Sequence, residues 1–182
     1  MYDIGEFVIY GTDGVCRVEK IGASKLPEMS AEKKYYTLCP VYEKGCEIVT
    51  PVDQDRIVMR RVLEKQEVMD LIDRMGELPE IWVREEKKRE EDYKEVIRSC
   101  DCERLLSMIK TLYRRKQMRL AAGKKVTAKD MKYFNMAETN LYGEFAVALD
   151  LTPAKVKERI ISQMKEKEQN QKASEEMENV RS

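Results

Sequence analysis

The hydrophobic pattern changes its period near residue 63, and this change limits the fold more than any other feature of the sequence. Before it, apolar and polar residues alternate in short β-branched and aromatic runs such as Val15-Cys-Arg-Val-Glu-Lys-Ile21, which is typical of half-buried strands. After it, apolar residues recur every three or four positions, as Leu105, Ile109 and Leu112 do, which is typical of amphipathic helices. The sequence therefore predicts an α+β protein, with a β domain followed by an all-helical domain.

Five short strands are expected in the β domain, at residues 6–10, 15–21, 34–42, 46–50 and 57–61. The Gly11-Thr-Asp-Gly14 cluster predicts a turn after the first strand. Pro51 ends the fourth because proline cannot donate a hydrogen bond to a neighbouring strand. Strands this short bury an adequate core only if they curl into a small five-stranded barrel, which we place at residues 1–62. Small barrels commonly bind proteins, and a partner can extend an exposed edge strand.

Residues 63–80 are predicted to connect the two domains. A helix from Leu63 to Met75 is expected to end at a Gly76 cap. A hinge follows at Leu78-Pro79-Glu80, because proline disfavours helix at the residue before it.

The helical domain is placed at residues 81–165, with helices at 83–98, 102–120 and 127–149 and a last one from Thr152. Asp101 is a plausible N-cap, Thr127 and Asp130 have the spacing of a capping box, and Thr152-Pro153 supplies an N-cap and a first-turn proline. Residues 166–182 contain almost nothing to bury, so we expect a charged, disordered tail.

Charge is balanced over the whole chain but uneven along it. The 182 residues include 34 Lys and Arg against 34 Asp and Glu, which argues against a uniformly basic nucleic-acid coat. Between Arg104 and Lys132, however, ten residues are basic and only Asp130 is acidic. A cationic segment this dense is typical of proteins with a polyanionic partner.

Residue types needed for catalysis or metal binding are scarce. The sequence has no histidine, the commonest general base and metal ligand. Its five cysteines are an odd number, Cys100 and Cys102 lack zinc-knuckle spacing, and all five are expected to stay reduced. Cys39 and Cys46 flank a predicted hairpin and either face each other or lie in the core, the arrangement that we favour. We predict a non-enzymatic protein without catalytic residues, metal or cofactor.

Trp82, the only tryptophan, directly follows the predicted hinge. Two interpretations stand: the ring fills the joint between the domains, or it lies at the surface, where it stacks on or wedges between DNA bases. Arg84 and the open N-terminus of the next helix would suit a phosphate group.

The run Tyr113-Arg-Arg-Lys-Gln-Met-Arg119, continued by Lys124 and Lys125, is the second feature of interest. Helical spacing places Arg115 and Arg119 on one face, with Arg114 and Lys110 on a neighbouring row. The run is either an ordinary solvated surface, where a helix C-terminus favours cations, or a surface for phosphates, which position a protein without reading sequence.

Motifs in both halves resemble those of CarD-like transcription regulators, over roughly residues 1–165. The β domain resembles their RNA-polymerase-interacting domain, a domain type shared with the bacterial transcription-repair coupling factor, in Tyr2-Asp-Ile-Gly-Glu-Phe-Val-Ile-Tyr10, Asp13-Gly-Val15, Tyr35-Tyr36 and Ile48-Val-Thr-Pro-Val52. The helical half is similar to theirs in Trp82-Val-Arg84, Leu112-Tyr-Arg-Arg115 and Asn140-Leu-Tyr-Gly-Glu-Phe-Ala146.

The resemblance implies a Tudor-like barrel that docks on the β subunit of RNA polymerase, partly by strand pairing. A basic residue of the family's fourth strand aligns with Val49, so the polymerase-binding residues are expected to be Lys25, Lys44, Glu47, Ile48, Val49 and Pro51. The helical domain would reach the upstream edge of the melted promoter, with Trp82 at the minor groove. Contacts to the DNA backbone are expected from Arg84, Arg114, Arg115, Arg119, Lys124 and Lys125.

The resulting hypothesis is a transcription regulator that stabilises the open promoter complex without sequence-specific DNA readout. The alternative is a polymerase-docked protein-protein adaptor without direct DNA contact. The N-terminus lacks a basic region followed by an apolar run, and no apolar stretch approaches the ~20 residues needed to span a bilayer. We therefore expect a monomer of the bacterial cytoplasm with no membrane contact.

Overall fold

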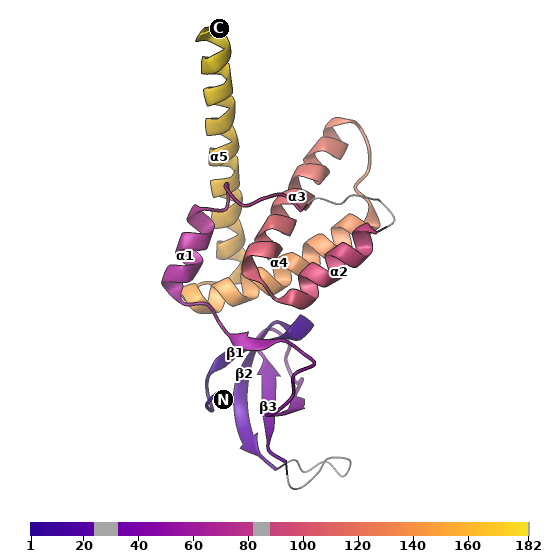
Figure 1. The fold of residues 1–182 in the computed structure, drawn as a ribbon, viewed down its shortest axis with the longest axis vertical. Coiled ribbons are helices and arrows are strands. Elements are labelled where there is room, and N and C mark those ends of the chain that lie inside the picture. The colour runs from indigo at the N-terminus through magenta and orange to yellow at the C-terminus, as the bar shows by residue number, and fades with distance from the viewer. Residues whose placement is uncertain (24–32, 82–87, 182) are drawn as a thin grey trace.

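The computed structural model describes residues 1–23, 33–81 and 88–181. A small sheet domain at the N-terminal end stacks under a helical domain, and the last helix projects away from both (Figure 1). The α+β class predicted from the change of period is confirmed.

The sheet domain contains five antiparallel strands in the order β4-β3-β2-β1-β5. Their bounds are β1 Phe7–Tyr10, β2 Val15–Gly22, β3 Tyr35–Pro40, β4 Ile48–Pro51 and β5 Met59–Arg61. One face of the sheet forms a core because alternate residues point inward, and its buried members are Val8, Tyr10, Cys16, Val18, Tyr36 and Leu38. The order leaves β4 and β5 as the edge strands of the described sheet.

The turn between β1 and β2 is a short 3-10 helix, η1 (Gly11–Asp13), which contacts the helical domain at α2 (Arg89–Ser99). Gly11 has φ +49 and Gly14 has φ +72, backbone conformations that cost little only for glycine. A Cβ on Gly11 would lie 2.7 Å from Cγ2 of Ile57. Both conformation and space therefore require glycine at position 11.

We expect Gly11→Ala to lower the free energy of unfolding by about 1–2 kcal/mol, the typical cost of a left-handed L-residue. Urea denaturation measures the change. Gly22→Ala is the matched control, because no atom of the described residues lies within 4 Å of a Cβ built on Gly22. Equal stability of the two variants would contradict the prediction.

The helical domain packs around one central helix. Its helices are α1 Lys65–Asp73, α2, α3 Cys102–Ala121, α4 Ala128–Leu149 and α5 Pro153–Arg181. α4 contacts the other four helices, which explains why residues 141–146 are all buried. Helices α2 and α3 contribute the other large core side chains, among them Tyr93, Ile97, Leu106 and Ile109.

Several predicted helix caps are present. The Asp101 carboxylate accepts a hydrogen bond from the Arg104 amide, the Thr127 hydroxyl oxygen accepts one from the Asp130 amide, and α5 begins at Pro153. Asp130, however, directs its carboxylate at Tyr93 and Arg115. Only the threonine half of the predicted capping box is thus borne out.

The prediction that Gly76 caps the first helix was wrong. α1 ends at Asp73 with Arg74 as C-cap, and its N-terminus has a capping box formed by Glu64 and Glu67 that we did not predict. The reason lies in the tertiary structure, because the Gly76 carbonyl accepts a hydrogen bond from the Lys110 side chain.

α5 continues to Arg181, through the segment predicted to be a disordered tail. The composition accounts for this, since Lys, Glu, Gln, Ala and Met favour helix and lengthening an existing helix needs no new nucleus.

All five cysteines are free, and Cys16, Cys100 and Cys102 are buried. Cys46 is exposed, so the favoured interpretation of Cys39 and Cys46 as core thiols was wrong for that residue.

Candidate nucleic-acid interface

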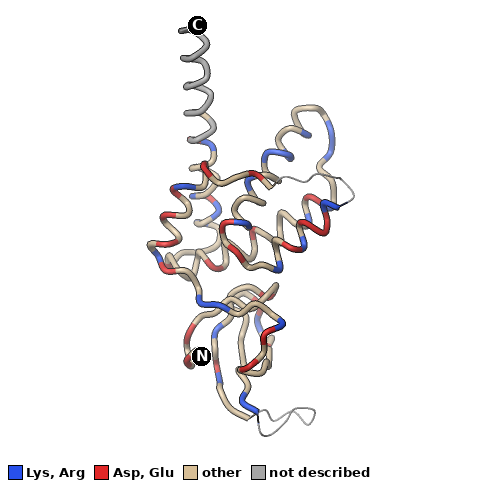
Figure 2. The backbone as a smooth tube through the Cα atoms, viewed as in Figure 1, with Lys and Arg blue, Asp and Glu red and all other residues tan. Residues whose placement is uncertain are grey.

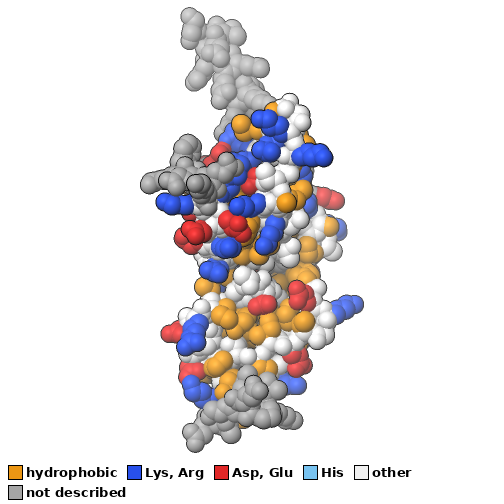
Figure 3. All heavy atoms as spheres, turned by 90° about the vertical axis from the view of Figure 1, so that its right-hand side faces the viewer, with side chains coloured by type: hydrophobic (Ala, Val, Ile, Leu, Met, Phe, Trp, Pro, Cys, Tyr) orange, Lys and Arg blue, Asp and Glu red, His pale blue; other side chains and the backbone are white. Residues whose placement is uncertain are grey.

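The predicted cations of the helical domain gather where α3 ends. We call Arg114, Arg115, Arg119, Lys124 and Lys125 the basic tip. Basic residues follow the last turns of α3 and the loop after it (Figure 2), and Lys and Arg side chains crowd the upper half of one face of the molecule (Figure 3). Gly123, with φ +68, turns the chain back beneath the helix, and the Lys124 amide donates to the Arg119 carbonyl at 2.8 Å.

Within the described part of the chain, three of the five basic-tip side chains have partners. Arg114 pairs with Glu80, Arg115 lies 3.5 Å from the Asp130 carboxylate, and Arg119 donates from Nε to the Lys125 carbonyl at 2.8 Å. Lys124 and Lys125 are exposed. The tip therefore combines cations held in place by partners with two lysines directed at solvent.

Asp130, the single acid of the basic stretch, is buried at 3% exposure. Its carboxylate faces the guanidinium groups of Arg89 at 3.7 Å and Arg115 at 3.5 Å, and it accepts from the Tyr93 hydroxyl at 3.4 Å. Burial and the Asp130 charge raise the pKa of Tyr93 to about 12. One carboxylate thus orients two arginines at the base of the tip.

α3 also holds the hinge that precedes Trp82. Lys110 donates from Nζ to the carbonyls of Gly76 at 2.8 Å and Leu78 at 3.0 Å. The Thr111 hydroxyl accepts from the Ile81 amide at 3.0 Å. Together with the Arg114–Glu80 ion pair, these contacts form what we call the hinge clamp, made by Lys110, Thr111 and Arg114. Trp82 and Arg84 themselves lie outside the described residues.

We expect Lys110→Met to weaken the action of Trp82 without removing any residue predicted to touch DNA. Methionine keeps the aliphatic length but cannot donate to the Gly76 and Leu78 carbonyls, so the hinge loses two hydrogen bonds of about 1 kcal/mol each. Open-complex lifetime on a promoter should fall about threefold from the wild-type value. Lys116→Met, on the same helix, is the control. An equal loss of open-complex lifetime in both variants would mean that the lost positive charge, and not the lost hinge contacts, causes the effect.

The residues predicted to bind polymerase are divided between edge strand β4 and the loops beside it. Ile48, Val49 and Pro51 are half-buried on β4, whose one described partner is β3, with Val49 opposite Thr37. Lys44 and Glu47 are exposed in the preceding turn, and Lys25 lies outside the described residues. Among the described strands, none lies on the second side of β4, as strand pairing with a partner would require.

Sequence reasoning missed the roles of Lys110 and Asp130, which organise the site. It also missed the buried pair Arg60–Glu144, which lies where the sheet meets the helices. Two signals were present. Asp130 is the one acid among ten cations, and Glu144 interrupts an apolar run from Leu141 to Leu149. An isolated acid in such surroundings indicates a partnered carboxylate. Lys110 gave no such signal, because backbone carbonyls are invisible in a sequence.

The described residues contain no cluster of three or more His, Cys, Asp or Glu side chains suited to hold a metal ion. A cleft of about 660 Å³ lies between α1 and the turn joining α2 to α3, lined by Arg60, Leu63, Glu67, Asp70, Leu71, Arg74 and residues 99–103. Its charged groups include Glu67, bound to Arg61, and Glu103, bound to Arg74.

None of the helices in the described ranges has the length and apolarity to cross a membrane.

The described residues thus form a five-stranded sheet with β4 at one edge, joined to a group of helices that carries the basic tip. Residues 2–63 match the CarD-like/TRCF RID domain family. The matched residues are therefore similar to the RNA-polymerase-interacting domain of CarD-like proteins, in the part of the chain where the sequence motifs indicated that resemblance. No curated protein matched the chain. The match connects the protein to transcription through RNA polymerase and identifies the matched domain as a non-enzymatic one.

Proposed function

We propose that the protein docks on the β subunit of RNA polymerase and contacts promoter DNA at the upstream edge of the bubble, so that the open complex lasts longer. The RNA-polymerase-interacting domain at residues 2–63 carries the proposal. The available edge of β4 supports docking by strand pairing, a mode in which backbone hydrogen bonds give affinity and flanking side chains give specificity.

DNA contact is supported by the basic tip. Lys124 and Lys125 are exposed cations, and Met118 and Leu120, 72% and 52% exposed, lie beside them in the chain. Exposed cations beside apolar groups suit a phosphate backbone and a groove wall, which sequence-independent binders use. The hinge clamp supports the role of Trp82, because it fixes the chain at the residue before the tryptophan.

An adaptor without DNA contact is the second candidate. It is favoured by the internal partners of Arg114 and Arg115, which lower the charge available to phosphates. In that case the helical domain would bind a further protein, and the tip would be an ordinary solvated surface.

The two candidates differ in how the protein responds to loss of Lys124 and Lys125. We expect the variant Lys124→Gln/Lys125→Gln to co-elute with polymerase like the wild type but to lose most of its effect on open-complex lifetime. Each lost phosphate contact should reduce the dependence of the logarithm of binding on the logarithm of salt by about one. Lys65→Gln/Lys155→Gln, which removes two exposed lysines from α1 and α5, is the control. Identical lifetimes and salt slopes for both variants would favour the adaptor.

A further inference from the structure

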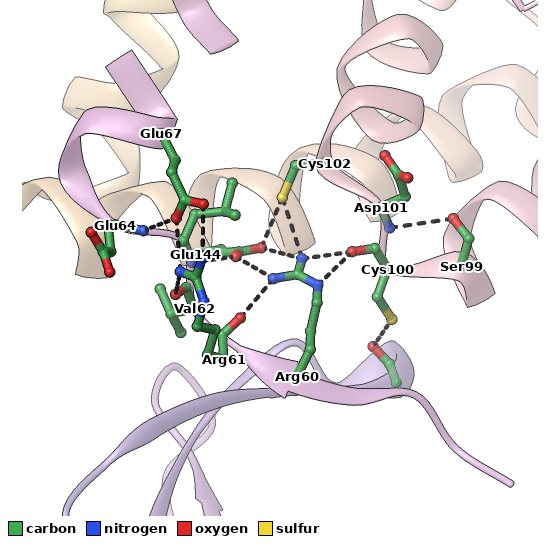
Figure 4. A network of polar contacts seen from close by, with 12 residues as sticks. Arg60, Arg61, Val62, Glu64, Glu67, Ser99, Cys100, Asp101, Cys102 and Glu144 are labelled. Carbon is green, nitrogen blue, oxygen red and sulfur yellow. Dashed lines mark hydrogen bonds and ion pairs between the residues drawn. The ribbon is translucent and has the colours of Figure 1, made fainter. Parts of the chain in front are cut away.

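The two domains meet at a buried polar centre that neither predicted interface uses (Figure 4). Arg60 lies on β5, the last strand of the sheet, and Glu144 lies on the central helix α4. We call this pair and its hydrogen-bond partners the junction. Side-chain exposure is 27% for Arg60 and 2% for Glu144, so a carboxylate is enclosed where the domains touch.

The Arg60 guanidinium group donates hydrogen bonds to several partners at once. Nη1 and Nη2 donate to the two Glu144 oxygens at 2.6 and 2.8 Å, a bidentate arrangement. Nε and Nη2 also donate to the Cys100 carbonyl, at 3.0 and 2.6 Å. Burial lowers the pKa of Arg60, but the hydrogen bonds and charge of Glu144 outweigh it and raise the pKa. The planar fork of arginine suits this double contact, whereas lysine would act as a point charge.

The Glu144 carboxylate also accepts hydrogen bonds from residues other than Arg60. Its Oε1 accepts from the Leu63 amide at 3.0 Å, in the segment that leaves the sheet, and its Oε2 accepts from the Cys102 thiol at 3.1 Å. Burial and the nearby carboxylate raise the pKa of Cys102, which keeps the thiol protonated as a donor. The carboxylate therefore ties β5, the connecting segment and the start of α3 to α4.

A small apolar cluster surrounds the polar centre. Ile9 and Val15 of the sheet domain pack with Cys100 of the helical domain, and Val62 and Val147 lie against them. The Cys100 thiol donates to the Gly11 carbonyl at 3.2 Å. The Tyr42 hydroxyl donates to the Gly143 carbonyl at 3.1 Å.

The spacing of residues on α4 explains how one helix serves two domains. Asn140, Gly143, Glu144 and Val147 are three or four apart and therefore share one face. All four lie near sheet-domain or connecting residues, and a Cβ on Gly143 would meet the Tyr42 ring at 3.0 Å. The neighbouring positions Leu141, Phe145 and Leu149 belong to the helical core.

Such a junction selects one arrangement of the domains. Two domains joined by a short segment are expected to move relative to each other unless their interface holds them. A buried ion pair often adds little net stability compared with apolar residues, but it accepts only a narrow range of geometries. Here the geometry joins the domain that binds polymerase to the domain that carries the basic tip.

We propose that Arg60 and Glu144 are positioning residues, which hold the basic tip in a single orientation relative to the polymerase-docking sheet. The inference rests on the proposed function, since a fixed orientation matters when both domains must reach their targets in one complex. Once the sheet is docked on polymerase, a helical domain that samples many orientations would meet the promoter in the productive one only part of the time. The fraction of docked protein that contacts DNA therefore falls, even when polymerase is saturated with the protein.

The test uses the full-length variant Arg60→Gln/Glu144→Gln, which removes both charges and leaves no buried ion without a partner. Arg61→Gln is the matched control, because Arg61 is the next residue and its ion pair with Glu67 is exposed. Residual dipolar couplings of the amides measure domain orientation. Open-complex lifetime is measured at increasing protein concentration until it reaches a plateau, and polymerase affinity is measured separately.

In the wild type and Arg61→Gln, one alignment tensor should fit both domains. In the double variant, each domain should require its own tensor, polymerase affinity should be unchanged, and the plateau of the lifetime increase should drop about fivefold. A merely structural role would reduce the folded fraction and shift the half-effective concentration without lowering this plateau.

Retention of a single tensor by the double variant, or a plateau equal to that of the wild type, would overturn the inference. A wild-type protein that does not lengthen the lifetime at all would instead overturn the proposed function. The dipolar couplings decide the orientation claim independently of that outcome.

Discussion

Trp82→Ala is expected to remove most of the open-complex lifetime that the protein adds, about a tenfold loss, while the variant still co-elutes with polymerase. Stacking of a base on an aromatic side chain contributes about 1–3 kcal/mol by alanine substitution, and 1.4 kcal/mol corresponds to a factor of ten. Polymerase docking should be unaffected, since the docking domain at residues 2–63 does not include Trp82.

Dissociation of preformed open complexes after addition of a competitor measures this lifetime. Trp82→Phe is the matched control, because it keeps a flat apolar ring and should retain part of the effect. The interpretation of Trp82 as a plug between the domains predicts a different result, in which Trp82→Ala lowers the thermal midpoint and Trp82→Phe largely restores it. An unchanged lifetime with both variants bound to polymerase would leave the adaptor as the function.

Most of the fold was predictable because it depends on local patterns. The change of hydrophobic period separated the sheet from the helices, and Asp101 and Thr127 marked two helix starts that the structure confirms. The end of α1 was not predictable in the same way. Gly76 has the chemistry of a cap, but its carbonyl is held by Lys110 on another helix, 34 residues away, and a local pattern carries no information on such a contact.

For the basic tip, too, local sequence patterns do not predict contacts between distant residues. The density of basic residues in the sequence predicted the five members of the basic tip. It did not predict their partners, because Arg114 pairs with Glu80, 34 residues earlier, and Arg115 pairs with Asp130, 15 residues later. These pairings decide which cations are already engaged within the protein. The composition predicts a surface for a polyanion, whereas the structure distinguishes Lys124 and Lys125 from the arginines that are already engaged.

The junction between Arg60 and Glu144 was the part of the structure that the sequence predicted least. Arg60 and Glu144 are 84 residues apart, and their roles depend on how the two domains meet. Glu144 belongs to the Asn140–Ala146 motif and is an acid within an apolar run. Such a position predicts a partner without naming it. Interfaces between domains are thus the part of this fold for which a single sequence is least informative.

Glu144→Ala should be strongly destabilising, with a loss of about 3 kcal/mol in the free energy of unfolding. Removing one member of a buried ion pair typically costs 3–5 kcal/mol because the other charge is left without compensation. Arg60 is 27% exposed at its side chain and can be partly hydrated, which places the expected loss at the lower end. The Leu63 amide and the Cys102 thiol also lose their acceptor.

Chemical denaturation and calorimetry measure this loss, which for a chain of this size corresponds to about 6–12 °C in thermal midpoint. Glu158→Ala, an exposed glutamate on α5, should stay within about 0.5 kcal/mol of the wild type. Adding Arg60→Gln to Glu144→Ala should recover part of the stability, because the uncompensated cation is then gone. A double variant as unstable as the two single changes combined would contradict this pairing, since coupled partners do not add.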